Sequence, residues 1–202
     1  MRLALNKNLI WMLILLCGLI LLIPACSASP DEIDQTPTSQ PDGNLPPEVP
    51  QPQPTEIRQW AIEAEASSSF ADPEWAPEQA AGKPNTLRCG DLQTAWAAAV
   101  PDTLEWLELK YSTDVYVTAV NITQTFNPNQ ISKVELIDSF GNSLIIYEQP
   151  PVPVDQPCPY TLSIPVEKTR SRYNTVRVTV DQSALGLGWN EIDAVELVGE
   201  RK

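Results

Sequence analysis

The side chains that could do chemistry in this sequence are unevenly represented. The chain has 26 Asp and Glu residues and four Cys, but no His. The absence of His excludes a Ser-His-Asp triad, a Cys-His nucleophile pair and every His-ligated zinc or iron site. A pair of carboxylates could still hydrolyse a glycosidic bond, but no recognisable cleft motif accompanies them. The sequence therefore predicts a protein that is not an enzyme.

Two aromatic side chains, Trp75 and Phe126, stand in proline-containing, loop-like stretches. An exposed ring there can stack on a sugar while Asn127 and Arg88 hydrogen-bond the hydroxyls, which is the usual division of labour in a small-molecule site. We therefore predict a shallow ligand-binding platform made of these four residues; in the alternative, the rings only cover the end of the domain. The aromatic residues assigned to packing, because they lie within or beside strand patterns, are Trp60, Trp96, Trp106 and Trp189.

The first 25 residues have the order of a secretory signal. Arg2 and Lys7 precede an apolar run at residues 9–23, and Pro24 ends this run short of the roughly 20 residues of a spanning helix. The sequence Ile23-Pro24-Ala25-Cys26 is similar to the bacterial lipobox. We expect residues 1–25 to be a lipoprotein signal peptide and Cys26 to be lipidated, which would anchor the protein to a membrane of the bacterial cell envelope, on its extracytoplasmic side. An uncleaved signal-anchor and simple secretion are the alternatives.

Cys89 and Cys158 are the thiols that remain once Cys17 leaves with the signal peptide and Cys26 is acylated. Two remaining cysteines in an exported domain favour a disulfide, so we predict a Cys89–Cys158 bridge. The alternatives are two separate reduced cysteines, or a metal site that uses both thiols.

Residues 26–56 are rich in proline, together with Asp, Gln, Ser and Thr, and have almost nothing apolar to bury. This composition predicts a disordered, partly polyproline linker. The rest of the chain, residues 57–202, has the size of one domain.

Short β-like runs separated by turns fill this domain. In the clearest of them Val176, Val178 and Val180 face inward, while Arg177 and Thr179 face outward. Further runs are predicted at residues 57–66, 104–111, 115–125, 131–138, 144–147, 160–164 and 191–198, and a short helix between Pro77 and Gly82. This pattern predicts an all-β fold, an antiparallel jelly-roll β-sandwich.

Three stretches resemble the discoidin, or coagulation factor 5/8 C-type, family of galactose-binding-like domains: residues 64–70, residues 76–86 leading to Ala95-Trp96, and residues 188–199. In that family a small-residue turn ends the opening strand, a short helix precedes a buried Trp, and acidic and apolar residues alternate in the closing strand. The resemblance implies an eight-stranded jelly roll that binds ligands with loops at one end. Such domains commonly bind carbohydrate, sometimes lipid headgroups or protein, and are rarely enzymes by themselves.

The same resemblance implies a structural calcium ion near the opening turn, held by backbone carbonyls, an Asp, a Thr and a closing-strand Glu. Thr94 and Glu196 are the best matches for the last two. Because no acidic residue stands beside the short helix, a plain polar turn is the alternative. We expect no other cofactor.

The net charge of −13 makes nucleic acid an unsuitable partner, because phosphate binding needs clustered cations. We therefore expect a non-catalytic binding module, displayed on the cell surface, that recognises carbohydrate through the loops at one end of the sandwich. The rival hypothesis is a structural or protein-interaction domain of an envelope assembly, which binds an envelope protein and no sugar.

Overall fold

The computed structural model describes residues 55–155 and 158–202. The predicted signal peptide, most of the predicted linker and the predicted lipidation site Cys26 lie outside these residues. The elements, in chain order, are β1 (Glu56–Trp60), β2 (Glu63–Ala66), the 3-10 helix η1 (Pro77–Ala80), β3 (Trp96–Ala97), β4 (Leu104–Phe126), β5 (Ile131–Ile137), β6 (Ser143–Glu148), β7 (Tyr160–Pro165), β8 (Arg172–Asp181) and β9 (Glu191–Glu200).

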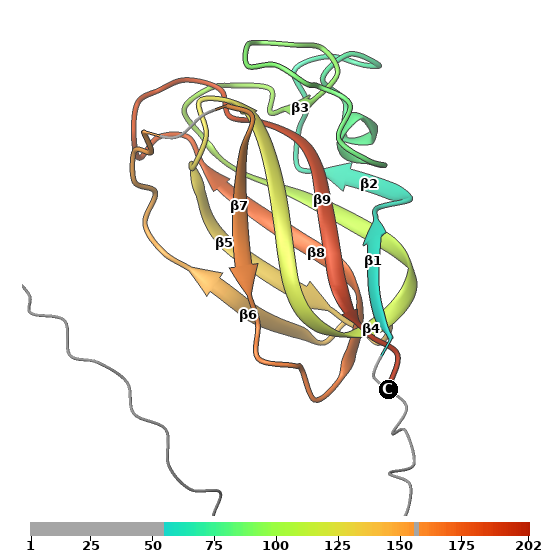
Figure 1. Cartoon of the computed structure of the whole chain (residues 1–202). Helices are drawn as coiled ribbons and strands as arrows, with labels where there is room; N and C mark the ends of the chain where they lie inside the picture. The colour runs from blue at the N-terminus through green and yellow to red at the C-terminus, as the bar shows by residue number, and fades with distance from the viewer. Residues whose placement is uncertain (1–54, 156–157) are drawn as a thin grey trace, which may run out of the picture. The chain divides into compact units, whose positions relative to one another are not determined.

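Strand β4 belongs to both layers of a sandwich (Figure 1). Its first half, up to Lys110, pairs with β2 and β8, whereas its second half, from Tyr116, pairs with β9 and β7. One layer therefore has the order β1-β9-β4-β7 and the other the order β2-β4-β8-β5-β6, and these pairings are antiparallel. The predicted antiparallel jelly-roll β-sandwich is confirmed.

The strands predicted at residues 104–111 and 115–125 are thus one bent strand. Its bend lies between Lys110 and Val115, where the register with β8 shifts. The side chain of Gln59 holds the bend, because it accepts from the N–H of Thr113 at 3.2 Å and donates to its carbonyl at 2.6 Å. The sequence pattern broke at this bend because three polar residues interrupt the apolar alternation there.

The stretch predicted as one opening strand, residues 57–66, forms two strands in the structure, β1 and β2. At Ala61 and Ile62 the chain passes from β1, which pairs with β9, to β2, which pairs with β4 in the other layer. Buried Ala61 accepts a hydrogen bond from the N–H of Gly82, just after η1, at 2.9 Å. Pro77 begins η1 as predicted, and Gly82 follows it with a φ of 89°, which favours glycine.

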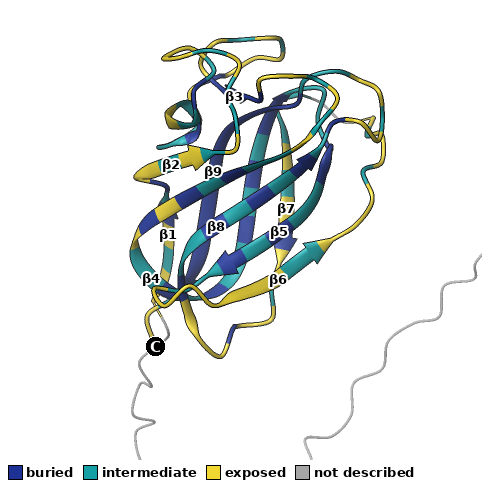
Figure 2. Ribbon diagram, turned by 180° about the vertical axis from the view of Figure 1, so that it is seen from behind, coloured by how far each residue is buried: buried dark blue, intermediate teal, exposed yellow. Residues whose placement is uncertain are grey.

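The core lies between the two layers and is supplied by alternate residues of the long strands (Figure 2). Val176, Val178 and Val180 of β8 are buried as predicted, with Arg177 and Thr179 on the outer face. In the second half of β4 the buried positions change parity between Val117 and Val120, where a bulge shifts the register with β9.

The two ends of the sandwich are formed by different parts of the chain. Glu56 pairs with Glu200, so the start of β1 and the end of β9 lie together at one end (Figure 1). The other end, called the loop end below, is made of the connections at residues 67–103, 127–130, 149–155, 158–159 and 182–190. No helix in the described part of the chain is long and apolar enough to cross a membrane.

Candidate functional site

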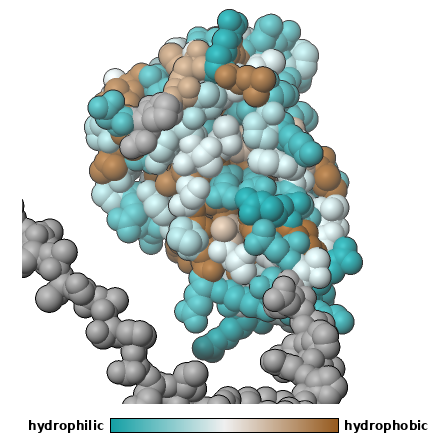
Figure 3. Space-filling model, viewed as in Figure 1, coloured by the Kyte–Doolittle hydropathy of each residue, from teal (hydrophilic) through white to brown (hydrophobic). Residues whose placement is uncertain are grey.

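Three aromatic side chains meet at the loop end. The ring of Phe70 packs edge-on against Trp75, with centroids 5.2 Å apart, and against Trp189, with centroids 5.5 Å apart. About 51 % of Phe70 is exposed, whereas Trp75 and Trp189 are half-buried. We call these three residues the aromatic cluster. Figure 3 shows hydrophobic residues at the surface among hydrophilic ones at the loop end.

The short strand β3 and Ala98, the residue after it, position all three rings. The carbonyl of Ala97 accepts from the N–H of Phe70 at 2.9 Å, and its N–H donates to the carbonyl of Trp75 at 3.2 Å. The carbonyl of Ala98 accepts from the indole N–H of Trp189 at 3.0 Å. Because β3 itself pairs with the start of β9, the aromatic cluster is fixed to the sandwich rather than to a free loop.

Trp75 adopts a backbone conformation that is rare for a bulky residue, with a φ of 57°. Such a residue costs about 1–3 kcal/mol and persists only where surrounding contacts determine it. Here the backbone hydrogen bonds to Gln93 and Ala97 hold it, and the indole N–H donates to the carboxyl of Glu191 at 3.3 Å.

A small hollow of about 40 Å³ lies beneath the aromatic cluster, and the remaining residues that line it are Asp91, Ala97 and Glu191. Glu191 opens β9 and is only 1 % exposed. Its carboxyl also accepts from the N–H of Leu92 at 3.1 Å. Burial, together with the neighbouring Asp91 carboxylate, raises the pKa of Glu191 to about 8, against the opposite effect of the Leu92 hydrogen bond. The hollow therefore combines aromatic faces with a carboxyl that is protonated at neutral pH.

Of the predicted platform residues, Trp75 and Phe126 both adjoin Glu191. Phe126 lies opposite Glu191 in the β4–β9 pairing, and opposite residues of an antiparallel pair present their side chains on one face. The side chain of Asn127 is engaged in other hydrogen bonds: its amide donates to the carbonyls of Leu187 at 2.7 Å and Trp189 at 3.0 Å. It therefore holds the loop that carries Trp189.

Arg88 is exposed and lies outside the hollow. It lines a neighbouring, more apolar depression of about 430 Å³, together with Thr94 and the strongly exposed Leu87. The structure thus places Trp75 in the lining of the hollow and Phe126 outside that lining, opposite Glu191 in the β4–β9 pairing. It assigns Asn127 to loop support and places Arg88 in an adjoining depression.

The residues predicted for calcium do not form one donor set. Both carboxylate oxygens of Glu196 are engaged: they accept from Arg58 at 2.7 and 3.0 Å and from the amide of Asn121 at 2.8 Å. The hydroxyl of Thr94 instead lies 2.6 Å from that of Thr86. A cationic partner on Glu196 and the lack of a shared carboxylate do not fit the oxygen cage that calcium needs. Within residues 55–155 and 158–202 no group of three or more Asp, Glu or Cys could hold a metal.

The acidic residue that organises the turn after η1 is Asp193. Its fully buried carboxylate accepts from the backbone N–H groups of Asn85 and Thr86, with distances of 3.2–3.4 Å. Four N–H to oxygen contacts on one carboxylate tie this turn to β9.

The predicted Cys89–Cys158 disulfide is confirmed, with Cα atoms 5.3 Å apart. It joins the loop that carries Asp91 to the segment before β7. The N–H of Gly90 also donates to the carbonyl of Thr125 at 3.0 Å, so the loop is attached to the end of β4 as well. Asp91 is therefore fixed by its chain neighbours: Cys89 and Gly90 before it are attached to the sandwich, and the N–H of Leu92 after it donates to Glu191.

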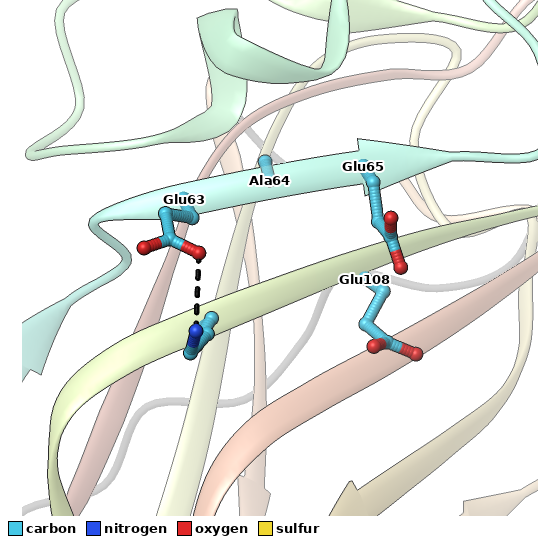
Figure 4. Close-up of a pocket in the computed structure, with 5 residues that line it drawn as sticks. Glu63, Ala64, Glu65 and Glu108 are labelled. Carbon is cyan, nitrogen blue, oxygen red and sulfur yellow. Dashed lines mark hydrogen bonds and ion pairs between the residues drawn. The ribbon is translucent and has the colours of Figure 1, made fainter.

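A second, wider hollow of about 340 Å³ lies on the outer face of β2 and β4 (Figure 4). Its lining includes Glu63, Glu65, Glu108 and Lys110, and Glu63 pairs with Lys110 at 3.2 Å. Glu108 accepts from Arg177 at 2.8 Å. Since no aromatic side chain lines this hollow and two of its carboxylates have basic partners, the hollow at the loop end is the better candidate.

Sequence reasoning missed Phe70, Asp91, Trp189 and Glu191. The sequence pattern predicts a packing role for Trp189 and places Glu191 in the acidic and apolar alternation of the closing strand. The sequence contains one signal for this site: in Trp189-Asn190-Glu191 a carboxyl stands at the start of a predicted strand. A carboxyl that is buried there needs hydrogen-bond partners from a loop.

The fold and the aromatic site define a β-sandwich of the galactose-binding-like, discoidin kind, which confirms the resemblance found in the sequence. More particularly, the chain belongs to the family described as Pappalysin-1, SD scarf domain, C-terminal, which matches residues 52–202. No curated protein matches the chain.

Solved structures with this fold are distant in sequence. A chitosan-binding module from a chitosanase/glucanase of Paenibacillus sp. IK-5 is 15 % identical, with a TM-score of 0.52 over 67 % of this chain and 92 % of that one. The lectin binding domain of Lectinolysin, solved with Lewis b, is 14 % identical, with a TM-score of 0.51 over 68 % and 92 %. A Clostridium perfringens module in complex with GlcNAc-α-1,4-galactose is 15 % identical, with a TM-score of 0.50 over 68 % and 89 %. These likenesses establish the fold.

Proposed function

We propose that the chain is a non-catalytic binding module that recognises carbohydrate at the loop end of the sandwich. The observation that carries this proposal is the aromatic cluster, in which the half-exposed Phe70 is backed by Trp75 and Trp189 beside the carboxyls of Asp91 and Glu191. An exposed ring can stack on a sugar, while neighbouring polar groups hydrogen-bond the hydroxyls.

The names of the structural neighbours support the same proposal. The Paenibacillus module binds chitosan, and the Lectinolysin domain and the Clostridium perfringens module were solved with Lewis b and with GlcNAc-α-1,4-galactose. Because these proteins share only the fold, the argument for this chain depends on its own aromatic cluster.

The second candidate function is a protein-interaction domain of an envelope assembly. It is favoured by β6, which forms the outer edge of its layer and leaves Leu144 and Ile145 exposed (Figure 2). An edge strand with apolar side chains and unpaired backbone groups can pair with a partner strand.

A glycan array probed with the purified full-length protein tests the carbohydrate proposal. We expect binding to a restricted set of glycans, and loss of that binding in Trp75→Ala. Phe140→Ala is the matched control, because Phe140 is 89 % exposed in the β5–β6 turn, away from the loop end. Absence of binding to any glycan, or equal binding by Trp75→Ala, would contradict the proposal. Repeating the array with a calcium chelator should change nothing, because Glu196 is engaged by Arg58.

We further propose that a lipid on Cys26 and the proline-rich linker display this module outside the membrane of a bacterial cell envelope. The proposal is supported by the lipobox-like sequence and by the position of Glu56, which begins the domain beside Glu200. The loop end lies at the other end of β9, a strand of ten residues and so about 30 Å long. A tether that enters at Glu56 would therefore join the domain at the end opposite the aromatic cluster.

A further inference from the structure

The hollow beneath the aromatic cluster is acidic and has no basic side chain in its lining. Asp91 and Glu191 supply two carboxyls, Phe70, Trp75 and Trp189 supply three rings, and neither Lys nor Arg is among the lining residues in the described part of the chain. The polar groups that donate to Glu191 are the backbone N–H of Leu92 and the indole N–H of Trp75, which carry no net charge. The site therefore has no positive charge of its own to balance its carboxyls.

Two neighbouring carboxyls in such a place cannot both be ionised at low cost unless a cation lies close to them, so one of them otherwise keeps its proton. At neutral pH that proton is on Glu191, since the pKa of Glu191 is raised to about 8 by burial and by Asp91. A ligand that brings its own positive charge can take the place of this proton.

The size of the hollow limits what can enter it. Its volume of about 40 Å³ lies well below the roughly 300 Å³ at which pockets for whole small molecules begin. A sugar ring must therefore remain outside, against the exposed face of Phe70, while one small substituent enters between the rings. An amine is small enough to enter this space.

We propose that the hollow receives the ammonium group of an amino sugar, so that the carbohydrate bound by this module carries a free amine. This inference depends on the proposed carbohydrate-binding function and names its ligand class. The ammonium group lies among the rings of the aromatic cluster and beside Asp91 and Glu191. On binding, the carboxyl of Glu191 gives up its proton to the buffer and pairs with the ammonium group as a carboxylate.

Aromatic rings distinguish this ligand from a metal ion. The faces of Trp and Phe attract a desolvated ammonium group within about 6 Å of the ring centroid. Calcium instead requires six to eight oxygen ligands, and the hollow offers the oxygens of two carboxyls. A neutral hydroxyl would fit by size, but it cannot take the place of the proton that neutralises Glu191.

Isothermal titration calorimetry on the full-length protein tests this inference with a β-1,4-linked glucosamine tetramer and its fully N-acetylated counterpart. We expect the glucosamine tetramer to bind about tenfold or more tightly, because hydrogen bonds to charged groups are about twice as strong as neutral ones. At about pH 6, titrations in two buffers of different ionisation enthalpy should show release of close to one proton per bound ligand, because Glu191 is then protonated in the free protein.

Asp91→Asn and Glu191→Gln should each weaken binding of the glucosamine tetramer about tenfold, and Glu191→Gln should abolish proton release. Asp91 is exposed, so its variant keeps the test valid even if Glu191→Gln fails to fold. Glu65→Gln is the matched control for Asp91→Asn, because it also removes one exposed carboxylate, here on β2. It should bind as the wild type does.

The outcomes separate this inference from the proposed function. Equal or tighter binding of the N-acetylated tetramer would overturn the amine inference and leave carbohydrate binding intact. No binding of either tetramer, with no glycan bound on the array, would overturn both. Binding of tetralysine that equals that of the glucosamine tetramer and survives Asp91→Asn would show attraction by net charge alone, and would also overturn the inference. Binding of calcium chloride alone that Glu191→Gln abolishes would assign the hollow to a metal instead.

Discussion

At the scale of single residues, Glu191 makes the stability of the protein depend on pH. The pKa of its carboxyl is about 8 in the folded protein and near 4.5 in an unfolded chain. As the pH rises from 4.5 to 8, the unfolded state loses this proton and the folded state keeps it, so the free energy of unfolding falls over this window and is not affected further above it.

We predict that Glu191→Gln removes this part of the pH dependence. Its free energy of unfolding relative to the wild type should rise by about 1–2 kcal/mol between pH 5 and pH 8.5, with allowance for solvent screening near the mouth of the hollow. Urea unfolding at the two pH values measures the difference. Glu65→Gln should keep the wild-type profile; an unchanged profile in Glu191→Gln would mean that Glu191 ionises normally.

Trp75 and Phe126 are predicted to serve binding more than stability. Trp75→Ala should abolish glycan binding and cost about 1–2 kcal/mol, because its ring is half-buried and packs on Phe70 at one edge. Phe126→Ala should weaken binding at a similar or smaller cost. Trp96→Ala is the comparison: its ring is 1 % exposed, and its loss should cost about 3–5 kcal/mol. If the loop-end variants lose as much as Trp96→Ala in urea unfolding, these rings are structural.

At the scale of elements, strands β4 and β9 approach each other closely at Gly199. A Cβ atom there would lie 2.5 Å from the carbonyl oxygen of Tyr116 and 2.6 Å from a methyl group of Val115. We predict that Gly199→Ala lowers the free energy of unfolding by about 3 kcal/mol, because the backbone of a paired strand must move to make room.

Gly186→Ala is the control for this prediction, measured by the same urea unfolding. Nothing lies within 4 Å of a Cβ at Gly186, but its φ of 61° is unfavourable for Ala, so a loss of about 1 kcal/mol is expected. A smaller effect at Gly199 than at Gly186 would argue against the close approach of β9 to β4.

The disulfide connects two elements of the loop end and should matter to both stability and binding. It closes a loop with a sequence separation of 69, which gives a stabilisation of about 4 kcal/mol from chain entropy. The double variant Cys89→Ser/Cys158→Ser should lose about this much in urea unfolding and should bind glycans more weakly, because Asp91 lies two residues from Cys89. Labelling of the unfolded, unreduced domain should find neither of these two thiols free.

At the scale of the whole molecule, the proposed tether enters the domain at the end opposite the candidate site. We predict that Cys26 is the lipidated N-terminus of the mature protein. Mass spectrometry of the membrane fraction checks this directly: an N-terminal peptide that begins at acylated Cys26 is expected, and an intact Met1 would contradict it. A Cys26→Ser variant should leave the membrane fraction while retaining glycan binding, because the aromatic cluster does not depend on the anchor.

The fold could be predicted from the sequence because its determinants are local. The alternation of Val176, Val178 and Val180 indicates a strand with one buried face, and turn residues mark where strands end. The disulfide followed from counting thiols. The bend that carries β4 from one layer to the other was missed, because polar residues at a corner and polar residues in a loop look alike in sequence.

The candidate site was decided only by the tertiary structure. Phe70 and Trp189 are 119 residues apart in the chain. The β3–β9 pairing of Trp96 with Ile192 joins them, because Phe70 bonds to Ala97 of β3 and Trp189 bonds to Ala98, the residue after it. Residue periodicity reports which face of a strand is buried, but it contains no information on which loops meet at the end of a sandwich. The sequence by itself therefore determined the strands, the thiol pair and the loop position of Trp75. Long-range hydrogen bonds decided that Trp75 faces Phe70 and a buried Glu191, and that Asn127 supports the loop of Trp189.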